Sequence, residues 1–107
     1  MSKAPEPTIT DALNRLWVKF LPQMEARVAT LETAAAALAS GTLTAELQEQ
    51  ASAEAHKLAG VLGTFGLHEG TKFAREAEDA SKGPLENSTD RLIEIAARLR
   101  ALIAGRQ

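Results

Sequence analysis

Residues 47–65 read LQEQASAEAHKLAGVLGTF, and their spacing of apolar residues is the clearest indication of how the chain folds. Its apolar residues recur every three or four positions, at Leu47, Ala51, Ala55, Leu58, Leu62 and Phe65. This spacing places them on one face of an α-helix, because one helical turn takes about 3.6 residues. Thr42 and Thr44 lie just upstream, and either can cap the first turn. The stretch therefore predicts an amphipathic helix that buries one face against other helices.

The same helical spacing recurs on both sides of this stretch. Upstream, it predicts a short helix over residues 9–20 and a longer helix over residues 24–38, with either a kink or a break at Pro22 between them. Downstream, it predicts helices over residues 67–82 and 92–103. The residues expected to cap or stop these helices are Thr8 or Thr10, Ser40, Gly41, Gly83, Pro84, Asn87, Ser88 and Thr89. The pattern predicts an all-α fold, an antiparallel four-helix bundle with a short extra N-terminal helix.

The composition fits one small helical domain. The chain has 107 residues, of which 45% are hydrophobic and 24% charged, so it can form a core but not a two-domain enzyme. Alanine supplies 21 residues and aromatic residues only 4%, which predicts a thin core. Residues 1–7 hold two prolines and no apolar period, so we expect a flexible leader before a domain over residues 8–107. Trp17 and Phe20 are expected in the core.

Charge and residue usage exclude several functions. Twelve Lys and Arg residues against fourteen Asp and Glu give a net charge of −2 without a basic cluster, which argues against nucleic acid as a partner. Cysteine is absent, so disulfides, thiol catalysis and thiolate metal sites are excluded. No stretch is long and apolar enough to span a bilayer, and we expect a cytoplasmic protein without a membrane partner. His68 has no metal-binding spacing to a second histidine, so no metal site is predicted.

His56 lies off the apolar face of the predicted helix, so its side chain is expected to face solvent. The residues around it on that outer face are all small: Ser52, Ala53, Ala59, Gly60 and Gly63. Glycine in a helix interior costs roughly 0.5–1 kcal/mol relative to alanine, so Gly60 and Gly63 need a compensating reason. There are three possible reasons: two helices pack closely at these positions, the helix ends early near Gly63, or a bulky partner needs room to reach the imidazole.

Residues 55–67, AHKLAGVLGTFGL, resemble the phosphoacceptor motif of histidine phosphotransfer (HPt) domains, in which a helix carries H-x-L-x-G followed by a glycine near its end. The matching residues are His56, Leu58, Gly60, Gly63 and Gly66. The GTFG sequence at residues 63–66 is similar to the phosphotransfer domains that begin chemotaxis-type histidine kinases. The resemblance covers most of the chain, because the order and lengths of the predicted helices also agree.

The resemblance implies a phosphoprotein of a two-component phosphorelay. His56 would accept a phosphoryl group from a receiver-domain aspartate or a histidine kinase and pass it on. The carrier would need no cofactor of its own, since Mg²⁺ is expected on the partner receiver domain, and it would have no autonomous kinase activity. We expect a monomer whose partner-binding surface surrounds His56 and comprises Ala53, Ala59, Gly60, Gly63 and Thr64.

Two further residues are site candidates. The commonest family pattern has a lysine three residues after the histidine, where this chain has Ala59. Lys57 can bring a replacement charge near the phosphate, or it can be an ordinary surface lysine. Glu78 falls where the chemotaxis-type domains place a glutamate that hydrogen-bonds the phosphoacceptor ring. The alternative for Glu78 is an ordinary acidic helix face.

Two other functions remain open at this point. The first is an adaptor bundle that binds a receiver domain without accepting phosphate, which the alanine at position 59 suggests. The second is a small enzyme in which His56 acts as a general base together with Glu78 or Glu49. The phosphotransfer module is the preferred interpretation, because a solvent-facing histidine with small neighbours fits it best.

Overall fold

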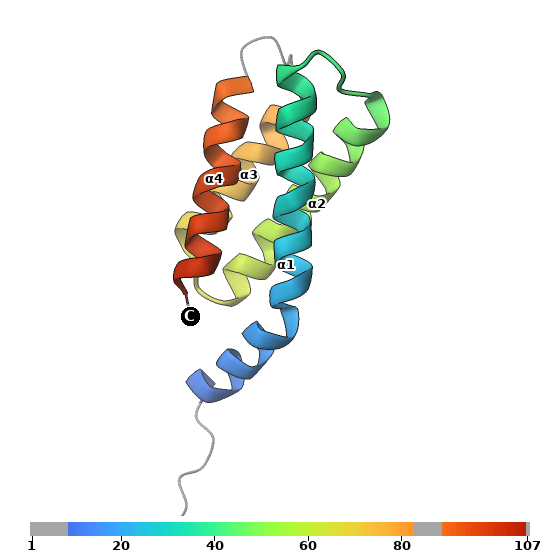
Figure 1. Cartoon of the computed structure of the whole chain (residues 1–107). Helices are drawn as coiled ribbons and strands as arrows, with labels where there is room; N and C mark the ends of the chain where they lie inside the picture. The colour runs from blue at the N-terminus through green and yellow to red at the C-terminus, as the bar shows by residue number, and fades with distance from the viewer. Residues whose placement is uncertain (1–8, 83–88, 107) are drawn as a thin grey trace, which may run out of the picture.

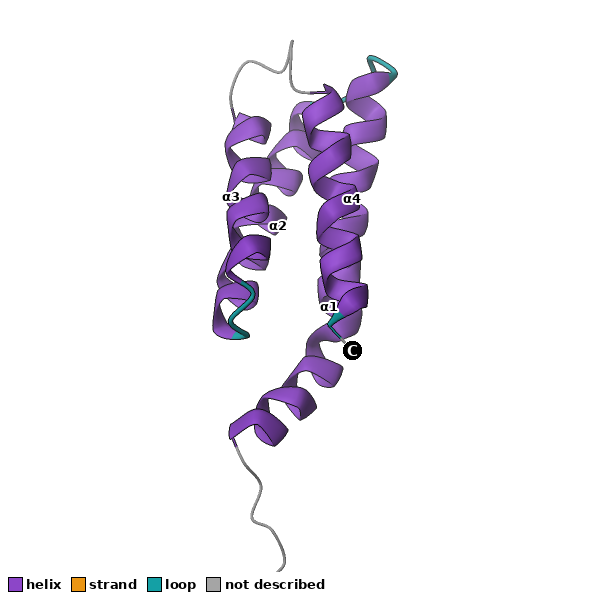
Figure 2. Ribbon diagram, turned by 90° about the vertical axis from the view of Figure 1, so that its left-hand side faces the viewer, coloured by secondary structure: helices purple, strands orange, loops and turns teal. Residues whose placement is uncertain are grey.

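The computed structural model describes residues 9–82 and 89–106, and within these ranges the chain forms four helices. They are α1 (Ile9–Ala39), α2 (Ala45–Thr64), α3 (His68–Lys82) and α4 (Thr89–Gly105). Successive helices run in opposite directions, and each packs against two neighbours, so that α1 and α4 close the ring (Figures 1 and 2). This arrangement confirms the predicted all-α antiparallel bundle.

The first helix differs from the prediction in one respect. The segments expected as two helices, residues 9–20 and 24–38, form the single helix α1, with Pro22 inside it. Proline has no N–H to donate to the carbonyl of Val18, and its ring crowds that carbonyl, so it bends a helix without always ending it. Figure 1 shows the blue N-terminal part of α1 turning away from the axis of the bundle. The expected extra helix is therefore an arm of α1.

The arm of α1 contributes little to the core. Trp17 is buried as predicted, with its ring 5.2 Å from that of Phe65 in an edge-to-face arrangement. The guanidinium of Arg106 covers the same indole ring at 4.6 Å. The prediction for Phe20 is wrong, because its side chain stays 37% exposed. The arm turns away from the bundle, so most of its apolar side chains have no helix to cover them.

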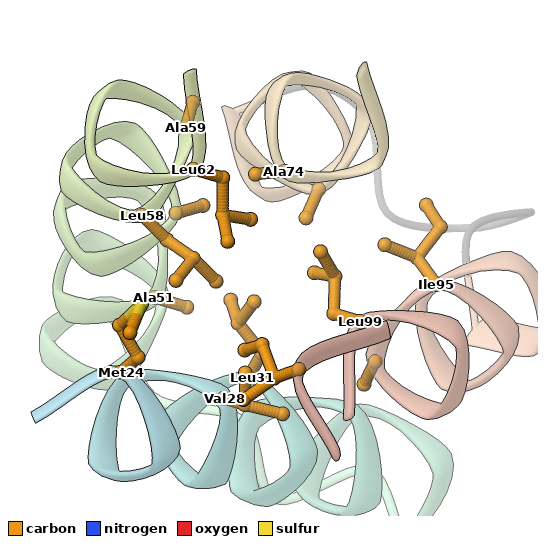
Figure 3. Close-up of a cluster of buried hydrophobic side chains, with 14 of the residues drawn as sticks. Met24, Val28, Leu31, Ala51, Leu58, Ala59, Leu62, Ala74, Ile95 and Leu99 are labelled. Atoms are coloured by element: carbon orange, nitrogen blue, oxygen red, sulfur yellow. The ribbon is translucent and has the colours of Figure 1, made fainter. Parts of the chain in front are cut away.

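The core lies on the bundle axis and draws on all four helices (Figure 3). Its largest fully buried side chains are Met24, Val28, Leu31, Leu58, Leu62, Leu92, Ile95 and Leu99. Between them, alanines from every helix are buried, among them Ala35, Ala51, Ala74 and Ala96. These small side chains let the backbones approach closely, which accounts for a core that is thin in aromatic residues.

The ends of α1 and α2 follow specific sequence signals. Thr44 caps α2, since its hydroxyl oxygen accepts a hydrogen bond of 3.1 Å from the N–H of Leu47. Gly41 follows α1 with φ at +72°, and Gly66 follows α2 with φ at +74°. This left-handed conformation is one that glycine adopts at little cost. The Gly66 turn lets the N–H of Leu67 bond to the carbonyl of Leu62 at 2.9 Å and directs the chain into α3.

Some of the expectations concern residues outside the described ranges. They are the leader over residues 1–7, the cap at Thr8, the stop at Gly83 and Pro84, and the cap residues Asn87 and Ser88. The domain boundaries at residues 8 and 107 also stay a prediction. Among the described helices, none combines the length and the apolar character that crossing a membrane would require.

An ion pair between Glu32 and Arg100 joins the first helix to the last. The guanidinium donates two hydrogen bonds of 2.7 Å to the carboxylate, and these bonds lower the pKa of Glu32 below its ordinary value of 4.5. The ion pair therefore stabilises the folded chain at pH values above 4.5. This stability is lost as the pH falls through the lowered pKa of Glu32. Both side chains are about two-fifths exposed, so water screens the pair and its contribution is at most about 1 kcal/mol.

We expect Glu32→Gln to lose less stability than the wild-type chain between pH 7 and pH 3. The difference should be at most about 1 kcal/mol, because only this pair is removed. Urea unfolding of both proteins at the two pH values measures it. Glu49→Gln, on the exposed face of α2, is the control and should follow the wild type. Equal acid sensitivity of Glu32→Gln and the wild-type chain would contradict the prediction.

Candidate functional site

His56 projects from the middle of α2 on the side opposite its most deeply buried residues. Its side chain is 75% exposed. Ala55 and Leu58, on either side of it in the sequence, are fully buried and hold the helix against the core. The ring therefore stands in solvent on a helix whose position is fixed by packing, in agreement with the helical spacing of the sequence.

Glu78 of α3 holds the imidazole ring. The Nδ1 atom of His56 lies 3.1 Å from Oε2 and 3.3 Å from Oε1 of this carboxylate. The Glu78 side chain is only 16% exposed, because it lies between α2 and α3. The neighbouring acid Glu76 points elsewhere and pairs with Arg91 of α4. The structure thus places Glu78 in contact with His56, whereas the neighbouring Glu76 has a different partner.

The contact with Glu78 decides which ring nitrogen is free. Hydrogen bonds from Lys82 and, less strongly, from His56 lower the pKa of Glu78, so its carboxylate is ionised at neutral pH and can only accept hydrogen bonds. Nδ1 must therefore carry a proton to donate to it. In the neutral ring the lone pair is then left on Nε2. The contact with Glu78 orients an exposed imidazole so that Nε2 is available as a nucleophile.

Lys82 is a third member of the site that the sequence analysis missed. Its Nζ atom donates a 3.0 Å hydrogen bond to Oε2 of Glu78, the same oxygen that faces His56. A sequence signal was present, because a glutamate four residues before a lysine on a helix is a favourable pair. The signal points to Lys82 only after Glu78 is known to face His56, and that requires the packing of α3 on α2.

An open groove between α2 and α3 contains these three residues. Its volume is about 700 Å³, and its walls are Ala45, Gln48, Glu49, Ser52, Ala53, His56, Lys57, Glu78, Ser81 and Lys82. The amide Nε2 of Gln48 donates a 2.7 Å hydrogen bond to the carbonyl of Ser81 and so ties the two helices together beside the groove. The groove gives a bound group simultaneous access to His56 and Lys82.

Three of the predicted partner-binding residues have positions that leave them accessible. Ala53 lines the groove beside His56. Gly60 is exposed, and a Cβ atom added there would meet no other atom within 4 Å. Thr64 is exposed at the end of α2, and its hydroxyl donates a 3.1 Å hydrogen bond to the carbonyl of Gly60. The surface on this side of His56 therefore carries short side chains and is open to solvent.

The prediction that Ala59 belongs to this open surface is wrong. Ala59 is 6% exposed, because it lies one helical turn after Ala55, on the side that packs against α3. Its carbonyl accepts a 3.0 Å hydrogen bond from the Thr71 hydroxyl. Gly63 also faces α3, since a Cβ atom added there would lie 3.4 Å from the same hydroxyl. The added Cβ atom would thus only make an ordinary van der Waals contact at Gly63, and open access stays the predicted reason for Gly60.

Lys57 lines the groove, but its ammonium group is directed to Glu54 instead of to Glu78. Its Nζ atom is 3.9 Å from Glu54, which also binds Arg27 of α1. The role of Lys57 toward a phosphate therefore stays a prediction. His68 is exposed at the start of α3 and lines a separate pocket with Gly63, so the structure does not bring it to His56. Within the described residues, no group of three or more histidine and acidic side chains is arranged to hold a metal ion.

Comparison with known proteins assigns the chain to a family. The chain matches the family model of the Hpt domain over residues 15–105, a range that reaches from α1 to α4. It is 39% identical over 66 residues to protein RcaC of Microchaete diplosiphon. That match covers 62% of this chain and 10% of RcaC, so the chain spans a small part of this relative. No solved structure matches the chain significantly.

Proposed function

This chain belongs to the Hpt domain family, whose members carry phosphoryl groups in phosphorelays, and we propose that His56 is its phosphoacceptor. The observation that carries the proposal is an imidazole that is 75% exposed while its Nδ1 lies 3.1 Å from the Glu78 carboxylate. This contact leaves Nε2 as the nucleophile. The proposed donor and acceptor is the aspartate of a receiver domain, and a histidine kinase is the other possible donor.

The transfer needs little chemistry from the carrier itself. Nε2 attacks the phosphorus of an aspartyl phosphate in line with the bond to the carboxylate oxygen. The N–P bond forms while the P–O bond breaks, and the bonding electron pair of the P–O bond returns to the aspartate. The imidazole, still protonated at Nδ1, becomes cationic, and the Glu78 carboxylate at 3.1 Å stabilises that charge. The reverse step returns the phosphoryl group to an aspartate.

Labelling of the wild-type chain tests this proposal. The chain is incubated with a receiver domain whose aspartate carries a radiolabelled phosphoryl group. A phosphoryl group on a histidine nitrogen is labile in acid and stable in alkali, so we expect label with those two properties to appear on this chain. A label that survives acid and is lost in alkali would contradict a phosphohistidine.

An adaptor that binds a receiver domain without accepting phosphate is the second candidate. It is favoured by the alanine at position 59, whose buried side chain places no cation beside the groove. The same labelling experiment separates the two functions. A stable complex with the receiver domain, in which no label reaches His56 from any donor, would support the adaptor.

Gly60 gives a test of access to the ring. We expect Gly60→Gln to slow phosphoryl transfer from a receiver domain several-fold, because a long side chain would occupy the open space beside His56. Gly60→Ala is the matched control and should keep the transfer rate, since its methyl group meets nothing within 4 Å. The alanine variant should also be about 0.5–1 kcal/mol more stable than wild type, because glycine weakens a helix interior. Unchanged transfer in Gly60→Gln, with unchanged helix content, would count against the access argument.

A further inference from the structure

Lys82 places a positive charge on the carboxylate that contacts the proposed phosphoacceptor. Its Nζ atom lies 3.0 Å from Oε2 of Glu78, and Nδ1 of His56 lies 3.1 Å from the same oxygen. The ammonium and the imidazole are therefore neighbours across one carboxylate atom. Both residues line the groove between α2 and α3, and the flexible lysine side chain can extend along it from the Nδ1 side of the ring toward a group on Nε2.

Lys57, the other lysine of the groove, is less well placed to bind a phosphoryl group on His56. Among the described residues, the walls of the groove include two lysines, Lys57 and Lys82. The ammonium of Lys57 lies 3.9 Å from Glu54, a carboxylate that is also bound by Arg27 and that does not contact His56. Lys82 is the lysine that shares a carboxylate with the phosphoacceptor ring.

A phosphoryl group on the ring creates a need for this charge. The group carries close to two negative charges at neutral pH, as in other phosphorylated side chains. An ammonium group has three N–H donors, of which Lys82 uses one on Glu78. The remaining donors can bind phosphoryl oxygens while the contact with Glu78 is kept. The side chain is 62% exposed and free to adjust its position.

We propose that Lys82 binds the phosphoryl group on His56 and supplies, from α3, the positive charge that Ala59 does not provide on α2. This inference rests on the proposed function of His56. It assigns Glu78 two tasks, since the carboxylate orients the ring through Nδ1 and also holds the ammonium group beside it. The cation thus reaches the phosphate from the facing helix instead of from the helix that carries the histidine.

Phosphoramidate, a small donor, tests the role of Lys82 without any partner protein. Nε2 of His56 attacks its phosphorus, and the nitrogen of the zwitterionic donor leaves as ammonia with the bonding electron pair. We expect Lys82→Gln to be labelled about three- to tenfold more slowly, as a partly exposed charge-assisted contact would predict. Lys82→Arg should restore the rate, and Lys19→Gln, at an exposed position on the arm of α1, is the matched control that should resemble wild type. Lys57→Gln tests the other lysine of the groove and should have a smaller effect than Lys82→Gln.

A titration by ³¹P NMR gives a reading that a purely structural lysine would not change. A cation beside the phosphoryl group favours its fully ionised form, so the pKa of the phosphoryl group should be higher in Lys82→Gln than in wild type. If wild type is labelled on His56 but Lys82→Gln matches it in both rate and pKa, the role of Lys82 is overturned while the phosphoacceptor stands. A larger effect of Lys57→Gln would also overturn it. If wild type is not labelled on His56, both proposals fail.

Discussion

Replacing His56 with glutamine is expected to abolish acid-labile phosphorylation of this chain. Glutamine keeps a polar side chain of similar length that can still donate a hydrogen bond to Glu78, but its amide nitrogen has no basic lone pair to attack phosphorus. The side chain is 75% exposed, so its replacement removes no core packing. The loss of label should therefore be complete while helix content and unfolding stability stay close to wild type.

The second histidine provides the control for this experiment. His68 is exposed like His56, but it begins α3 and lines a different pocket. His68→Gln should keep full labelling with the same acid lability. Label that persists in His56→Gln, or that disappears in His68→Gln, would show that the phosphoacceptor has been assigned to the wrong residue.

Leu58→Ala is expected to lower the free energy of unfolding by about 2–5 kcal/mol. Leu58 is fully buried in the core two residues after His56, and its truncation removes apolar contacts and leaves a cavity. Small domains are stable by only about 5–15 kcal/mol, so this one change could remove a large part of the total. Urea unfolding followed by circular dichroism measures the loss.

Leu16→Ala makes the same chemical change at an exposed site. Leu16 lies on the arm of α1 and is 41% exposed, so its truncation should cost well under about 1 kcal/mol. The contrast between the two leucines tests whether the core lies where the packing of the helices places it. Similar losses in both variants would mean that the arm is packed more tightly than the structure shows.

Helical periodicity predicted most of the bundle because the buried face of each helix is marked by its apolar residues. Leu58, Leu62, Ile95 and Leu99 are buried as that pattern required. The arm of α1 was not predictable in the same way. Phe20 has the spacing of a core residue, but whether a helix continues through Pro22 and diverges from its neighbours depends on packing that no local pattern records.

The site was predictable to the extent that it lies on a single helix. His56 could be placed on the solvent side of α2 from spacing alone. Ala59 could not be placed correctly, because burial against α3 depends on where the neighbouring helix crosses. The resemblance to a known family singled out Glu78, whereas Lys82 became visible only through its contact with that carboxylate. Contacts between helices are therefore the part of the site that a one-dimensional pattern does not determine.

The parts of the site are close along the chain as well as in space. His56 and Glu78 are separated by 22 residues, whereas Glu32 and Arg100, which join α1 to α4, are separated by 68. Closing a short loop costs less entropy than closing a long one, so a helical hairpin can form before distant segments meet. During folding, the imidazole and its carboxylate partner can thus find each other within α2 and α3 while the first and last helices are still apart.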